Sequence, residues 1–98
     1  MFVILTSRPG QYRTELGPGL HHCESYDYLF CGQAKARFDI ALLLQDVKIR
    51  VVDETPPERV NQIPSKFLPK FSSLAAARAE LQGLVRFGSI DARLRRVP

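Results

Sequence analysis

Apolar and polar residues alternate along much of the first half of the chain. Within residues 35–42, apolar side chains occupy every second position and charged side chains lie between most of them. The run 47–51 repeats the pattern, because three β-branched residues alternate with Lys48 and Arg50. Successive side chains of a strand point to opposite faces, so each of these strands has one buried and one solvated face. This pattern predicts an antiparallel β-meander.

Two earlier segments extend the predicted sheet to about five strands. Residues 2–6 are an apolar run rich in β-branched side chains, which is typical of a strand buried on both faces. Residues 11–16 alternate between apolar and polar positions, and they follow the turn-forming pair Pro9-Gly10.

A single helix is predicted near the C-terminus. Leu74 and Leu81 fall on one apolar face at helical spacing. Ser72 or Ser73 suits the N-cap of this helix, and Gly88 suits the left-handed position after its last turn.

The chain is therefore predicted to be one α+β domain in which the helix packs on the sheet. We expect strands within about 2–54, an irregular basic and aromatic loop at about 55–72, a helix at about 73–87, and a short terminal segment at 89–98 that is a candidate edge strand. The expected core contains Phe38, Ile40, Ile49, Val51, Leu74, Leu81 and Leu84.

Residues 24–31 carry three aromatic side chains whose environment depends on the turn that follows. A loop of two residues, Gly32-Gln33, would place them opposite charged residues, as an exposed platform suited to stacking bases. A loop of three residues, which adds Ala34, would place them opposite apolar residues in the core. The second register fits the pattern of both strands and is the expected one, although it puts Asp27 opposite Asp39. The aromatic residues concerned are Tyr26, Tyr28 and Phe30.

Composition bounds the class of protein. The 98 residues are 45% hydrophobic and 24% charged, which is sufficient for one compact domain. No apolar stretch approaches the roughly 20 residues needed to span a bilayer. Residues 2–6 lack the cleavage pattern of a signal peptide. We therefore expect a soluble, cytoplasmic protein that does not bind a membrane.

Charge is distributed unevenly along the chain. Residues 1–54 contain six Lys or Arg and seven Asp or Glu, whereas residues 55–98 contain eight and three. A basic half can attract an anionic partner. Nucleic-acid binding is therefore the alternative function, through a basic patch formed by Arg86, Arg93, Arg95 and Arg96.

Groups suited to catalysis or metal binding are few. His21 and His22 are the only histidines and adjoin Cys23, whereas a nucleophile and its base usually come from distant segments. Cys31 is eight residues further on, which is not an established zinc spacing. The sequence thus predicts no enzyme activity, no metal and no cofactor. A small metal or redox protein using Cys23 and Cys31 is a weaker alternative.

The segment "NQIPSKFLPKFSS", residues 61–73, combines apolar and basic side chains around two prolines, Pro64 and Pro69. We expect one phenylalanine to cover the core and the other to stay exposed beside the lysines, as a docking point for a partner. The predicted partner-binding residues are Lys66, Phe67, Lys70 and Phe71. The predicted function is a non-catalytic accessory or assembly module that docks onto a protein partner, and a second copy of the chain is an alternative partner.

Overall fold

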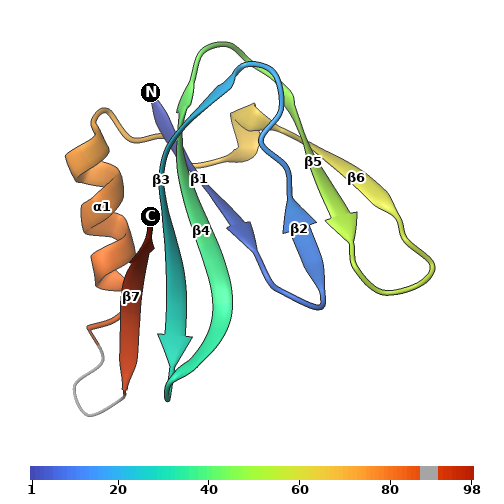
Figure 1. Cartoon of the computed structure of the whole chain (residues 1–98). Coiled ribbons are helices and arrows are strands. Elements are labelled where there is room, and N and C mark those ends of the chain that lie inside the picture. Colours follow the sequence, from blue (N-terminus) through green and yellow to red (C-terminus); the bar gives the residue numbers. More distant parts are fainter. Residues whose placement is uncertain (87–90) are drawn as a thin grey trace.

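Seven antiparallel strands and one α-helix make up the part of the chain that the computed structural model describes, residues 1–86 and 91–98 (Figure 1). The first sheet has the order β1-β4-β3-β7 and the second has the order β2-β5-β6. The predicted α+β class, with antiparallel strands, a helix packed on a sheet and a terminal edge strand, is confirmed. The elements are β1 Phe2–Ser7, β2 Tyr12–Thr14, β3 Leu20–Phe30, β4 Gln33–Leu43, β5 Lys48–Asp53, β6 Val60–Pro64, the short 3-10 helix η1 Ser65–Phe67, α1 Leu74–Gly83 and β7 Ala92–Val97.

The strands divide between two sheets because backbone pairing between β1 and β2 is limited to the turn, where Arg8 and Tyr12 exchange two hydrogen bonds, and side chains join the strands beyond it. The hydroxyl of Thr14 donates to the carbonyl of Thr6 at 2.5 Å, and the Thr14 N–H donates to Ser7 Oγ at 2.8 Å. The apolar strand β1 instead pairs with β4. The second sheet therefore turns away from the first, as the diverging ribbons of Figure 1 show.

The two faces of β1 contribute to two separate cores. Val3 and Leu5 are buried with Ala41 and Ile49 in the core between the two sheets. The alternate residues of β1 face the helix, where Ile40 is buried with Ala77 and Leu81. The partly buried residues around this second core are Phe2, Ile4, Cys23, Tyr26, Phe38, Phe71, Leu74 and Leu94.

The expected single core is therefore wrong in detail. Phe38, Ile40, Leu74 and Leu81 do pack together. Ile49 belongs instead to the core between the sheets, and the remaining two expected residues, Val51 and Leu84, are half-buried and exposed respectively. The division into two sheets separates residues that one continuous sheet would have joined.

Two predicted boundaries also require correction. The segment 55–72 is not wholly irregular, because β6 forms a hairpin with β5 and η1 follows it. Pro64 is compatible with β6 because a strand at the edge of a sheet tolerates a missing N–H. The helix begins after the N-cap Ser73, as predicted, but α1 ends at Gly83, a poor helix former, and not near residue 87. The predicted C-cap, Gly88, lies outside the described residues. No helix in the described ranges is long and apolar enough to cross a membrane.

The turn between β3 and β4 follows neither of the two expected registers. Its loop residues are Cys31 and Gly32, both with positive φ, as a two-residue hairpin turn of the I′ type requires. A bulge between Tyr28 and Leu29 then shifts the register, so that Tyr28 lies opposite Ala36. Tyr26 lies opposite Phe38. Tyr26 and Tyr28 therefore share the helix-facing side with the apolar residues, as expected for a core role, whereas Phe30 lies exposed beside the turn.

A second bulge in β3 buries a carboxylate under the helix. Cys23 is the extra residue, and it brings Glu24 opposite Ile40 on the helix-facing side. Glu24 is 4% exposed. Both oxygens of its carboxylate accept hydrogen bonds from Arg78 of α1, at 2.7 and 2.5 Å. Arg96 of β7 lies 3.0 Å away, and the Tyr26 hydroxyl donates to the carboxylate at 3.0 Å.

This Glu24 cluster, which consists of Glu24, Tyr26, Arg78 and Arg96, connects three elements. Hydrogen bonds from Arg78 hold the pKa of Glu24 at about 2, against the opposing effect of burial, with further help from Tyr26 and Arg96. Burial and the neighbouring carboxylate raise the pKa of Tyr26. The carboxylate is thus ionised and fully bonded, and it holds α1 and β7 against β3.

We expect the Glu24→Gln substitution to lower the free energy of unfolding by about 1.5–3 kcal/mol, the usual value for hydrogen bonds to a charged group. Because the folded pKa is depressed, ionised Glu24 stabilises the protein fully above the unfolded pKa of about 4.3. That stabilisation is lost as the pH falls through the folded pKa of about 2. Denaturant titrations between these pH values should show a smaller loss of stability in the variant. Glu58→Gln, at an exposed position, is the control, and equal pH profiles for wild type and Glu24→Gln would contradict the assigned role.

Candidate protein-binding surface

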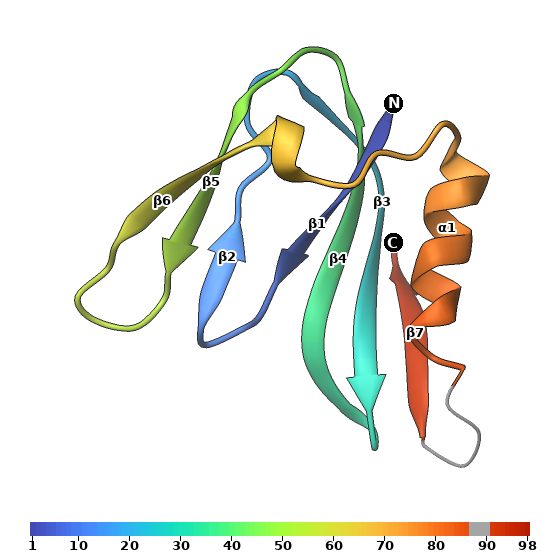
Figure 2. The same cartoon turned by 180° about the vertical axis from the view of Figure 1, so that it is seen from behind.

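The segment from η1 to Phe71 is held in place by hydrogen bonds to the rest of the fold. Ser65 is buried, its N–H donates to the carbonyl of Val47 at 2.8 Å, and its Oγ accepts from the Val47 N–H at 3.0 Å. Lys70 Nζ donates to the carbonyls of Ser65 and Leu68, at 3.0 and 3.3 Å. Figure 2 shows this segment running from the β5–β6 hairpin across to α1. The segment from η1 to Phe71 is therefore well anchored to the rest of the fold.

The two phenylalanines of this segment have different environments. Phe71 exchanges two backbone hydrogen bonds with Phe2, at 2.7 and 2.8 Å, and its ring packs against the core under α1. Phe67 is 70% exposed, and Lys66 Nζ lies 5.3 Å from the centre of its ring. Leu68 packs against the core between the sheets. The expectation that one ring points inward and the other outward is confirmed, with Phe67 as the exposed one.

Of the two lysines predicted to flank the exposed ring, only one does so. Lys66 lies over the Phe67 ring, an arrangement that favours a cation above the negative face of the aromatic system. Lys70 instead caps the carbonyls of η1, so its ammonium group has a local structural partner.

An apolar cleft of about 310 Å³ opens where the two sheets diverge. Ile63 of β6 lies on its wall and is 39% exposed. A second cleft, of about 190 Å³, continues from Ile4 and Thr6 toward the C-terminal end of α1 at Leu84. The first cleft is lined by Ile4, Leu5, Thr6, Tyr12, Thr14, Ile49, Val51, Asp53, Ile63 and Leu68.

We call the first cleft, Ile63 and Phe67 together the docking surface, because Phe67 directly precedes Leu68 on the cleft wall and carries Lys66 over its ring. Exposed apolar area beside a concave apolar surface is typical of a binding site. The surface combines residues from β1, β2, β5, β6 and the anchored segment. Sequence reasoning found Phe67 but missed Ile63 and the cleft, because both depend on the division into two sheets.

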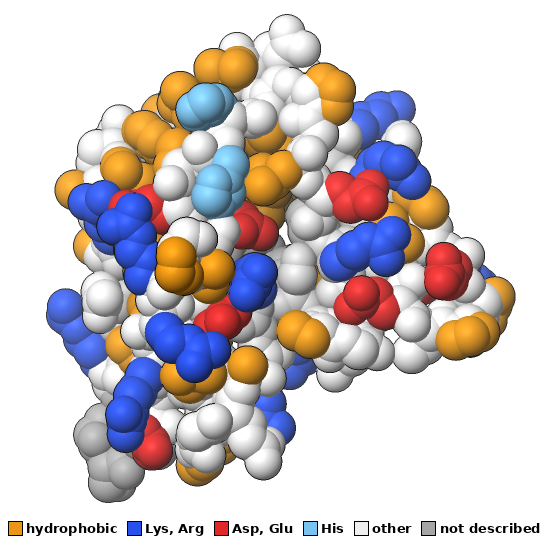
Figure 3. Space-filling view, in the orientation of Figure 1, with side chains coloured by type: hydrophobic (Ala, Val, Ile, Leu, Met, Phe, Trp, Pro, Cys, Tyr) orange, Lys and Arg blue, Asp and Glu red, His pale blue; other side chains and the backbone are white. Residues whose placement is uncertain are grey.

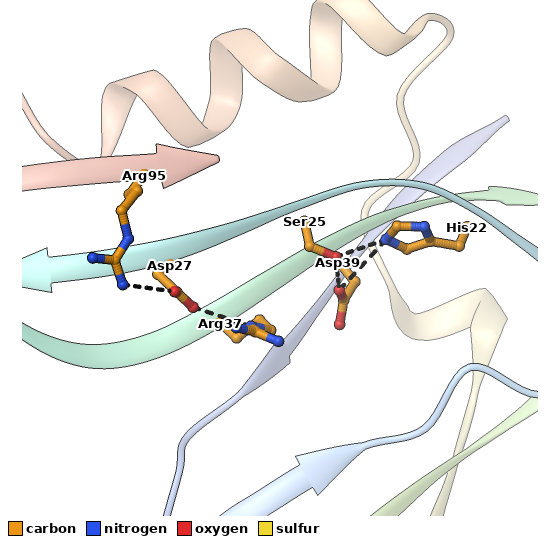
Figure 4. Close-up of polar contacts among 6 residues, drawn as sticks. All are labelled: His22, Ser25, Asp27, Arg37, Asp39 and Arg95. Atoms are coloured by element: carbon orange, nitrogen blue, oxygen red, sulfur yellow. Dashed lines mark hydrogen bonds and ion pairs between the residues drawn. The ribbon is translucent and has the colours of Figure 1, made fainter. Parts of the chain in front are cut away.

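A polar network lies on the face of the first sheet that points away from α1, where histidine and charged side chains gather (Figure 3). Ser25 Oγ donates a hydrogen bond to Asp39, and His22 Nε2 lies 2.6 Å from Ser25 Oγ and 3.8 Å from Asp39 (Figure 4). The bulge at Cys23 brings His22 and Ser25 to the same face, although they are three residues apart.

These three residues do not have the arrangement of a serine nucleophile. In such a site, the imidazole accepts the serine proton and the carboxylate bonds to the other ring nitrogen. Here the Ser25 hydroxyl donates its hydrogen bond to Asp39. In the contact with His22, Nε2 is therefore the donor and Ser25 Oγ the acceptor. The network therefore joins β3 to β4, and in it the imidazole of His22 is not the acceptor of the Ser25 proton.

Asp27 continues this network toward β7. The side chains of Arg37 and Arg95 donate to its two oxygens at 3.0 and 3.1 Å (Figure 4). Burial raises the pKa of Asp27, but the hydrogen bonds from both arginines outweigh it and leave the pKa below the usual value. The expected approach of Asp27 to Asp39 does not occur, because the register places Arg37 opposite Asp27.

The four arginines of the predicted basic patch do not share one surface. Alternation along β7 puts Arg96 on the helix side, in the Glu24 cluster, and Arg95 on the other side with Asp27. Arg93 lies 3.0 Å from Asp91, and Arg86 follows the end of α1. Three of the four are therefore next to carboxylates.

Cys23 and Cys31 are free thiols, half-buried and exposed respectively. In residues 1–86 and 91–98, no group of three or more His, Cys, Asp or Glu side chains is arranged to hold a metal ion. The absence of a metal and of a cofactor in the functional protein remains a prediction.

Comparisons with models of protein families, with curated proteins and with solved structures found no match. Function must therefore be argued from the surface itself.

We expect Phe71→Ala to lower the free energy of unfolding by about 3 kcal/mol, the lower end of the range for truncating a core phenylalanine, because the Phe71 ring is only partly buried. Phe67→Ala should change the same quantity by less than about 0.5 kcal/mol, since its ring is already in water. Thermal and denaturant unfolding of both variants measure the difference. Equal destabilisation by the two substitutions would show that the Phe67 ring is packed in solution.

Proposed function

We propose that the protein is a non-catalytic module that binds a protein partner through the docking surface, as an accessory or assembly factor. The observation that carries this proposal is an exposed phenylalanine, Phe67, on a segment that hydrogen bonds anchor to the fold. Burying a phenylalanine side chain stabilises a structure by about 1.5–3 kcal/mol, and Phe67 forgoes most of this in the free protein. A partner with an apolar pocket would recover it.

The anchoring of the segment supports a role in binding. Because Ser65 and Lys70 already fix the backbone around Phe67, little further ordering would oppose association. A central aromatic residue with a charged margin is also the usual composition of an interaction hot spot, and Lys66 supplies that margin.

Protein binding has more support than the nucleic-acid alternative. Arg93, Arg95 and Arg96 lie beside Asp91, Asp27 and Glu24, so their charges are partly neutralised. Tyr26 packs under α1 and does not offer a flat face for stacking. The proposal also locates the protein in the cytoplasm, where the free thiols of Cys23 and Cys31 stay reduced.

The test begins with a photo-reactive residue in place of Phe67, expressed in the native host, to cross-link and identify the partner. The purified partner is then titrated with the wild-type protein and with Phe67→Ala. We expect the substitution to weaken binding by about 2 kcal/mol, or roughly thirtyfold in Kd, as for a hot-spot aromatic residue.

Leu44 supplies the matched control, because it is 65% exposed and lies after β4, outside the docking surface. Leu44→Ala should bind like the wild type, and a photo-reactive residue at position 44 should not capture the same partner. Equal affinities for Phe67→Ala and the wild type would overturn the proposal.

A further inference from the structure

Strand β6 forms an open edge of the second sheet. It pairs with β5 on one side and is the last strand in the order β2-β5-β6. Figure 1 shows the β5–β6 hairpin on the side of the molecule away from α1. Val60 is 50% exposed, and the strand Val60–Pro64 has no charged side chain of its own. Such an edge can accept a further strand.

The register identifies the backbone groups at that edge. The Asp53 N–H donates to the Arg59 carbonyl at 2.9 Å, and the Ser65 N–H donates to the Val47 carbonyl at 2.8 Å. Hydrogen-bonded and non-hydrogen-bonded pairs alternate in an antiparallel ladder. The peptide groups of Val60, Gln62 and Pro64 therefore point away from β5. They offer two N–H donors and three carbonyl acceptors, because Pro64 has no N–H.

Alternation also determines where the side chains of an added strand would lie. Ile63 pairs with Ile49, and Asn61 pairs with Val51. Ile49, Val51 and Ile63 all line the first cleft. Every second side chain of a strand beside β6 would thus lie over the same apolar side, next to Ile63.

The charges around β6 favour an acidic occupant. Residues 58–70 contain three basic side chains and one acidic side chain, and Arg59 and Lys66 flank the strand. A second copy of the chain paired antiparallel to β6 would place Glu58 opposite Lys66, but it would leave Arg59 opposite Ser65 and would bring together two segments of net positive charge. An acidic segment would meet opposite charges at both ends.

We propose that the protein partner supplies an extended segment that adds as a fourth strand to the outer edge of β6. Its alternate side chains are aliphatic and cover the cleft beside Ile63, and acidic side chains near its ends face Arg59 and Lys66. This inference rests on the proposed function and specifies the kind of chain that the docking surface takes. It is recognition by strand addition, in which the backbone gives affinity and alternate side chains give specificity.

The test uses two blocked synthetic peptides, one of alternating valine and glutamate and one of alternating valine and lysine. Each is titrated into the labelled full-length protein and followed by NMR. We expect the glutamate peptide to shift the amide signals of Val60 and Gln62, to slow their hydrogen exchange, and to bind less tightly as salt is raised. The lysine peptide should bind at least about tenfold more weakly at low salt, because like charges meet at the ends of the strand.

Two substitutions of Gln62 distinguish the contribution of its backbone N–H to peptide binding from the contribution of its side chain. Gln62→Pro removes an outward N–H and should weaken the glutamate peptide about tenfold, the effect of losing one ladder hydrogen bond and its neighbours. Gln62→Ala keeps the N–H and should bind like the wild type. Circular dichroism checks that both variants are folded.

Four results of these titrations would overturn the inference. The glutamate peptide does not bind, Gln62→Pro binds it as tightly as the wild type, the shifted amide signals are confined to β7, or the protein forms a concentration-dependent dimer that Gln62→Pro abolishes. The partner that is cross-linked through position 67 provides a second test. If Phe67→Ala loses binding to this partner but Gln62→Pro does not, the proposed function is supported and strand addition is ruled out. If both variants bind the partner as the wild type does, the proposed function and strand addition are both ruled out.

Discussion

The buried carboxylate of Glu24 is the constraint on which the arrangement of the first sheet and the helix depends. An ionised carboxylate removed from water is costly unless charged partners and hydrogen bonds replace its hydration. Glu24 obtains those partners from α1 and β7, through Arg78 and Arg96. The helix and the last strand are distant from Glu24 in sequence, and the charge fixes where both can lie. The apolar contacts of Ala77 and Leu81 stabilise the packing of α1 on the sheet. The ion pairs of Glu24 fix where α1 and β7 lie along β3.

One extra residue in β3 creates this arrangement and the polar network on the opposite face. A strand normally alternates strictly, so Glu24 would face away from α1 if β3 were regular. The bulge at Cys23 reverses the faces from that point. Glu24 then meets the helix, whereas Ser25 joins His22 and Asp39 on the other side. The polar sequence "HHCES" is thereby distributed between two environments, in which Glu24 bonds to arginines and Ser25 to Asp39.

The difference between local patterns and contacts between distant strands explains how much of the fold could be predicted from the sequence. Alternation in β4 and β5, the serine N-cap and the apolar face of α1 are local signals, and each led to the right element. The bulges, the Cys31-Gly32 turn and the position of β6 depend on contacts between distant strands, and no local pattern reports them. Phe67 was identified because two prolines next to apolar and basic residues are visible in the sequence. Ile63 and the cleft were not, because they exist only where the second sheet diverges from the first.

That divergence separates the core under α1 from the apolar surface that lies exposed beside β6. The Glu24 cluster and the core under α1 stabilise the first sheet without help from β6 or η1. Between β1 and β2, Thr14 bonds through its side chain to Thr6, where a full ladder would have closed the cleft. The second sheet therefore keeps an apolar wall and an open edge, and the exposed ring of Phe67 follows directly in η1. Ile63, the open edge of β6 and Phe67 follow one another within residues 60–67, and this proximity is what supports the proposed binding of a partner.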